Sequence, residues 1–262
     1  MEKTHPMDTE TLSKAKALAE KIATACGTPL FYREQKVPID ESYRLFENNS
    51  MVATCIEILT ATANISGHGL VHARKVAVDT GAIILIEDRS SGEGENLTRL
   101  VSLAHIAGIL HDIKRSSKDH ARLGAEAAGN ILTRFDLTDT ERAAVVGSIR
   151  NHEAFQPSTS LADPDAQLLS NALYDADKFR WGPDNFTEML WDIVTTRDVS
   201  MHTLLSYFPS GLQSLEKIRD TFRTATGQKY GPGFIDLGLK IGDTLYAELG
   251  KGYRRNPTPH GG

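Results

Sequence analysis

Leu110-His111-Asp112-Ile113 places an imidazole beside a carboxylate, at the end of an apolar stretch that begins at residue 101. Neighbouring residues lie about 100° apart on a helix, so His111 and Asp112 can converge on one ion only near a helix terminus or a bend. A buried carboxylate needs a partner, and a divalent cation is an effective one. The stretch therefore predicts a helix that ends in a pair of metal ligands.

Further histidines and one aspartate stand in helix-like segments around this pair: His72, His120, His152 and Asp177. Along the chain the order is His, His-Asp, His, His, Asp. This order resembles that of the HD-domain metal-dependent phosphohydrolase superfamily, and the likeness covers about residues 65–182. It implies an all-α fold and a site that holds metal for phosphate chemistry.

The resemblance implies a role for each of these residues. His72, His111, Asp112 and Asp177 match the four core ligands of the mononuclear site in the family, and Asp112 is also the expected catalytic residue that orients or deprotonates a water. His120 and His152 resemble the two additional histidines of dinuclear members. The alternative is a mononuclear site in which these two histidines line the substrate phosphate.

Two ligand positions have neighbouring competitors. His68 lies one helical turn before His72, but the family spacing of His, three residues, then Val favours His72 through Val76. Asp175 and Asp177 lie about 200° apart on a helix, so both should not face one ion. The family form Ala-Asp-Lys selects Asp177.

Three basic residues are candidates for holding substrate phosphate. Arg115 occupies the place of the Lys in the family form His-Asp-Ile-Gly-Lys, although Lys114 replaces the usual Gly. Lys178 follows the expected ligand Asp177, and Arg180 comes two residues later. An arginine makes bidentate contacts to phosphate readily. The competing interpretation is that these are solvated charges at helix ends.

Several histidines with two carboxylates suit a borderline divalent metal such as Mn, Fe, Co, Ni or Zn. Mg prefers oxygen ligands and retained water, so it is a poorer match. We expect one or two ions. Such an ion lowers the pKa of a bound water towards ~7 and so generates a nucleophile.

Composition is that of a soluble enzyme. The chain has 262 residues, of which 29 are basic and 34 acidic, and its net charge is −5. No run of Lys and Arg indicates nonspecific nucleic-acid binding. Two cysteines do not make a disulfide framework, and no apolar run approaches the ~20 residues that cross a membrane. We expect a cytoplasmic protein with a small phosphorylated substrate, and a homo-oligomer is possible.

The organisation reads as all-α. We expect N-terminal helices over 1–64 that pack on the core, an HD domain over 65–182, and a C-terminal helical extension with a short tail over 183–262. Asp8 or Thr9 can cap the first helix, and Thr138 with Glu141 forms an expected capping box. Residues 28–41 look irregular.

The function that these features favour is metal-dependent hydrolysis of a phosphate ester or anhydride. A nucleotide or dinucleoside polyphosphate is the substrate class that the resemblance implies. One alternative is a di-iron oxygenase, which similar six-ligand HD scaffolds support. The other is a noncatalytic ligand-binding or signalling module. No phosphate-binding loop and no Gly-x-Ser-x-Gly motif points elsewhere.

Overall fold

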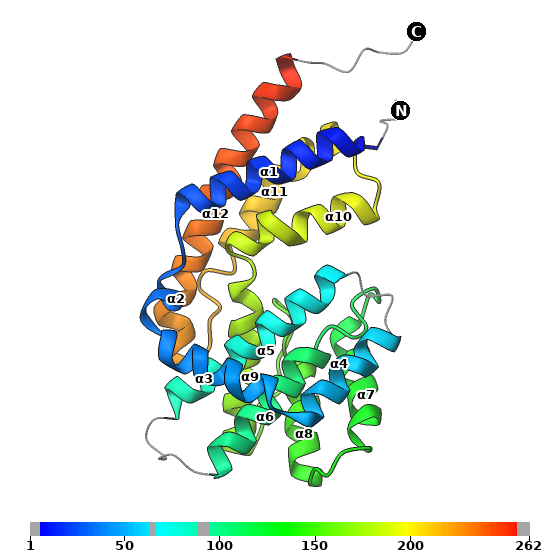
Figure 1. The fold of residues 1–262 in the computed structure, drawn as a ribbon, viewed down its shortest axis with the longest axis vertical. Helices are drawn as coiled ribbons and strands as arrows, with labels where there is room; N and C mark the ends of the chain where they lie inside the picture. Colours follow the sequence, from blue (N-terminus) through cyan, green and yellow to red (C-terminus); the bar gives the residue numbers. More distant parts are fainter. Residues whose placement is uncertain (1–5, 63–66, 89–94, 256–262) are drawn as a thin grey trace. The chain divides into compact units, whose positions relative to one another are not determined.

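The computed structural model describes residues 6–62, 67–88 and 95–255. These residues form α-helices and one π-helical segment, and no β-strand occurs among them (Figure 1). The predicted all-α class is therefore confirmed. None of the helices in these ranges is long and apolar enough to cross a membrane.

The chain forms two compact units. Unit 1 comprises residues 1–29, 181–219 and 232–262, and unit 2 comprises residues 30–180 and 220–231. This grouping differs from the expected division at residues 64 and 182. Residues 30–62 belong to the same unit as 67–180, and a short downstream segment, 220–231, joins them.

Unit 1 is assembled from helices at both ends of the sequence. They are α1 (Thr9–Cys26), η1 (Asn185–Met189), α10 (Leu190–Thr196), α11 (Met201–Glu216) and the part of α12 (Ala225–Arg255) from Pro232 onward. Asp8 caps α1, because its side chain accepts a hydrogen bond from the backbone N–H of Thr11 at 2.8 Å. The predicted start of the first helix is thus confirmed.

Unit 2 holds the remaining helices. They are α2 (Leu30–Glu34), α3 (Lys36–Glu47), α4 (Ser50–Thr62), α5 (Gly67–Glu87), α6 (Glu95–Leu110), α7 (His120–Leu132), α8 (Asp139–Arg150) and α9 (Pro164–Phe179). The capping box that starts α8 is present, since Thr138 and Glu141 each accept a hydrogen bond from the other's backbone N–H.

The prediction that residues 28–41 are irregular is wrong, because α2 and the first half of α3 lie there. Pro38 stands in the first turn of α3, where a missing N–H leaves no bond unmade. Phe31 of α2 and Phe46 of α3 are buried. Burial of these two rings, rather than local periodicity, accounts for the two helices.

The contact between α5 and α6 positions the predicted site. Gly108 lies directly against Ala77, and a Cβ at position 108 would stand 2.4 Å from the Cα of Ala77. Only glycine permits this close approach. His111 follows Gly108 by one turn. The close contact of Gly108 with α5 therefore places His111 on the side of α5 that bears His72.

Candidate metal centre

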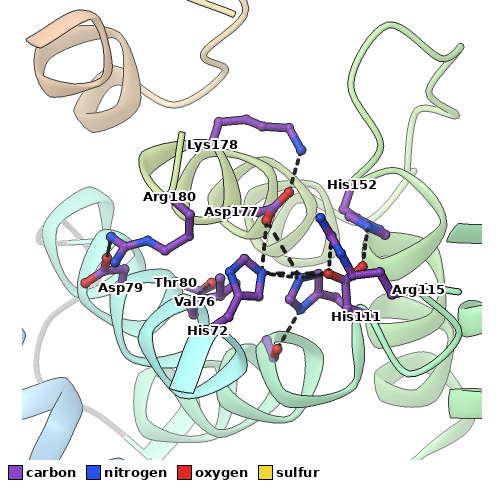
Figure 2. A network of polar contacts seen from close by, with 12 residues as sticks. His72, Val76, Asp79, Thr80, His111, Arg115, His152, Asp177, Lys178 and Arg180 are labelled. Carbon is purple, nitrogen blue, oxygen red and sulfur yellow. Dashed lines mark hydrogen bonds and ion pairs between the residues drawn. The ribbon is translucent and has the colours of Figure 1, made fainter. Parts of the chain in front are cut away.

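The predicted ligands come from five places in unit 2, and Figure 2 shows His72, His111, His152 and Asp177 pointing toward one another. His72 lies on α5, Asp177 lies in the last turn of α9, and His120 is the first residue of α7; His111 and Asp112 lie in the turn after α6, and His152 lies two residues past α8. The helix end allows His111 and Asp112 to converge. The side chain of His68, the alternative to His72, lies outside the described residues.

Four atoms form a first group. The Nε2 atoms of His72 and His111 are 3.2 Å apart. The Oδ1 of Asp177 lies 3.4 Å from the first and 3.7 Å from the second. The Oδ2 of Asp112 lies 3.7 Å from His72 Nε2 and 3.4 Å from His111 Nε2. Ligands held ~2.1 Å from one ion would be separated by about 3–3.5 Å, so this spacing suits a single metal.

A second group gathers at the other oxygen of Asp112. Its Oδ1 lies 3.6 Å from the Nε2 of His152 and 3.9 Å from the Nε2 of His120. The Nδ1 of His120 lies 3.9 Å from Glu153 Oε2. Asp112 therefore stands between two groups of imidazoles and offers one oxygen to each.

The ring tautomers direct lone pairs into the centre. The Nδ1 of His111 lies 2.7 Å from the carbonyl oxygen of Gly108, and the Nδ1 of His152 lies 2.6 Å from that of Ile149. A carbonyl oxygen only accepts, so each Nδ1 is the N–H donor and each neutral ring keeps its lone pair on Nε2. Metal-binding histidines commonly donate their other N–H in this way.

The two carboxylates are held in the charged form. Burial would raise the pKa of Asp112, but the nearby imidazoles of His111 and His152 and the guanidinium of Arg115 outweigh it and hold that pKa well below its usual range. Burial likewise opposes ionisation of Asp177, yet Lys178 and the nearby imidazoles hold its pKa well below its usual range. Burial lowers the pKa of His72. Ionised carboxylates beside imidazole nitrogens make a donor set that could hold a cation.

The donor set fits a metal ion. His72, His111 and Asp177 make one cluster that could hold a metal, and His111, Asp112 and His152 make another. The Oδ1 of Asp112 is buried and accepts no hydrogen bond. An ion at this oxygen would remove the cost of a buried acceptor without a partner.

Two of the three predicted phosphate-binding residues lie at this centre. The guanidinium of Arg115 contacts Asp112 Oδ2 at 2.5 Å, and its side chain is 57% exposed. The ammonium of Lys178 is buried and contacts Asp177 Oδ2. Arg115 therefore marks the side of the centre that solvent reaches.

Arg180 turns away from the histidines (Figure 2). Its guanidinium pairs with the buried Asp79 at 2.5 Å and donates to the hydroxyl of the partly buried Tyr32. Asp79 follows His72 by two helical turns on α5, and Arg180 follows Asp177 by one turn on α9. The buried ion pair thus fixes α5 against α9 in the register that sets His72 beside Asp177.

Sequence reasoning missed two residues, Arg223 and Thr224, that contact the chain next to the ligands. Arg223 donates to the carbonyl oxygen of Asn151 at 3.1 Å, directly before His152. Asp175 faces away from Asp177, as expected, and accepts bonds from the backbone N–H groups of Arg223 and Thr224. Burial raises the pKa of Asp175 to about 6 despite these bonds. No motif links residues so distant in the chain.

Comparisons with known proteins give no match, whether with family models, with curated proteins or with solved structures. Assignment of a function therefore depends on the residues themselves.

Proposed function

We propose that the protein is a metal-dependent phosphohydrolase of the HD type. The observation that carries the proposal is the position of Asp112, which offers one oxygen to His72 and His111 and the other to His120 and His152. This arrangement suits two ions that share a carboxylate, and paired ions stabilise the attacking and leaving oxygens of phosphoryl transfer. The order of the ligands along the chain supports the same class.

His72, His111, Asp112 and Asp177 would hold one ion, and Asp112, His120 and His152 would hold the second. The imidazole-rich set favours Mn, Fe, Co, Ni or Zn. When bound, such an ion lowers the pKa of a coordinated water and neutralises a phosphate oxygen.

The chain's own residues supply the remaining chemistry. With a single ion, Asp112 would hold the metal through one oxygen and orient or deprotonate a water through the other. Arg115 is exposed at the centre and can pair with an incoming phosphate, releasing Asp112 Oδ2 as it does so. Lys178 holds the outer oxygen of Asp177 and fixes the direction of that ligand.

The test is a screen of chelator-treated protein, reloaded with each metal in turn, against a panel of phosphate monoesters, diesters and anhydrides. Asp112→Asn should lower activity by about 100-fold or more, because it removes a ligand and a proton acceptor. Asp165→Asn is the matched control, since Asp165 is exposed at the start of α9.

Absence of hydrolysis with every metal would contradict the proposal, as would full activity of Asp112→Asn. Consumption of dioxygen by the iron-loaded protein would favour the oxygenase alternative. Metal binding with no turnover of any kind would favour the noncatalytic module.

A further inference from the structure

The loop that carries His152 is closed by the side chain of Asn151. This buried amide donates to the carbonyl oxygen of Thr159 at 2.8 Å and accepts from the N–H of Thr159 at 2.9 Å. It also donates to the hydroxyl of Ser170 on α9 at 3.2 Å. These hydrogen bonds therefore hold the two ends of the 152–158 loop together.

Along this loop the chain passes from the interior to the surface. His152 is buried, and Glu153 is half-buried with its carboxylate near His120. Phe155 follows and is 60% exposed. Three residues of chain span about 11 Å at most, so the Cα of Phe155 lies within about 11 Å of the Cα of His152.

Phe155 has an unusual backbone for its type. Its φ is +62°, in the left-handed region that bulky side chains rarely adopt. Exposed apolar residues are common on protein surfaces and need no explanation alone. Here an exposed aromatic ring, a strained backbone and a closed loop coincide beside candidate ligands, and such strain concentrates at functional sites.

We propose that Phe155 is a stacking platform for the base of a nucleotide whose phosphate lies at the metal centre. The inference rests on the proposed function and names its substrate class. A phenyl ring stacks on any base through its π-face, and it has no polar atom with which to distinguish one base from another. Recognition should therefore tolerate different bases, with purines favoured by their larger faces.

The test compares adenosine 5′-monophosphate with ribose 5-phosphate, which lacks only the base. With Mn-loaded protein, Phe155→Ala should lower kcat/KM for the nucleotide by about 5- to 150-fold, mainly through KM, as loss of one stacking contact predicts. Hydrolysis of ribose 5-phosphate should not change, and Phe155→Trp should retain nucleotide activity. Tyr43→Ala removes a similarly exposed ring from α3 and should affect neither substrate.

Phe155→Gly separates stacking from packing. Glycine adopts a positive φ without strain, so this variant should keep or raise the Tm while losing the same nucleotide activity. A lower Tm with equal loss on both substrates would show that Phe155 only packs the loop. Unchanged kinetics for Phe155→Ala on both substrates would also overturn the inference.

Failure of the proposed function has a different signature. Wild-type protein would then hydrolyse neither compound, and equilibrium dialysis of adenosine 5′-monophosphate with the same Mn-loaded variants would decide the inference. Weaker binding by Phe155→Ala than by wild type and Phe155→Trp would support stacking. Equal binding, or none, would refute it.

Discussion

Asp112 and His105 show how surroundings decide what a buried ionisable residue does. Asp112 is surrounded by imidazoles and a guanidinium, so it keeps its charge. His105 lies five residues before Leu110 on the same helix, beside Ser42 at 3.0 Å and the ring of Phe46. Burial lowers the pKa of His105 to about 3.

His105 should make the stability of the protein depend on pH. The unfolded chain binds a proton at this residue below about pH 6.5, whereas the folded protein does so only near pH 3. The free energy of unfolding should therefore fall as pH drops through this window, by up to about 1.4 kcal/mol per unit from this group. Urea unfolding between pH 4 and 6.5 should show a shallower slope for His105→Gln. Parallel slopes for the two proteins would contradict this.

At the scale of elements, the contact of α5 with α6 matters most. Gly108 allows the two helices to touch. His111 and Asp112, which follow the end of α6, then lie beside His72. On α9, Asp177 faces the centre, while Arg180 one turn later binds Asp79 of α5. Three helices are thus held by contacts that also place the ligands.

Gly108→Ala should disrupt the centre. The added methyl would lie 2.4 Å from backbone of α5, and backbone cannot rotate away. We expect a loss of about 1–3 kcal/mol or more in the free energy of unfolding, together with weaker metal binding. Gly129→Ala in α7 is the control, because its Cβ would meet only Val146 at 3.4 Å. That change should be neutral or stabilising. Equal stability of the two variants would refute the role of Gly108.

Local signals predicted some element boundaries and not others. Asp8 and Thr138 were identified from cap chemistry that operates over three residues, and both caps are present. The helices over residues 30–47 were missed, because Pro38 and a polar stretch hide them until Phe31 and Phe46 are seen to be buried. The partner of Arg180 is 101 residues away, so its place just after Asp177 made it a candidate for phosphate binding and could not reveal Asp79.

At the scale of the whole molecule, segment 220–231 returns to unit 2 from far along the chain. Arg223 lies over the ring of Tyr174, with its guanidinium carbon 3.6 Å from the ring centroid, and donates to Asn151. Thr224 donates to Asp175 through its N–H and its hydroxyl. These contacts place residues 220–231, which belong to the expected C-terminal extension, in unit 2.

Thr224→Val should destabilise unit 2. Valine keeps the shape of threonine but lacks the hydroxyl, which donates a buried hydrogen bond of 2.7 Å to Asp175. A buried carboxylate that loses a donor costs about 1–3 kcal/mol in the free energy of unfolding. Thr244→Val, at an exposed position of α12, should change it by less than about 0.5 kcal/mol. Urea unfolding of both variants measures the difference. A harmless Thr224→Val would show that the segment does not support the centre.

The central claim is that metal lies between the convergent histidines and carboxylates, and anomalous scattering at the metal edge tests it most directly. Crystals of the full chain loaded with excess Mn or Fe should show two peaks, one contacted by His72, His111 and Asp177 and the other by His120 and His152, with Asp112 between them. A single peak at the first group would reject the shared-carboxylate arrangement. No peak at either group would contradict the account as a whole.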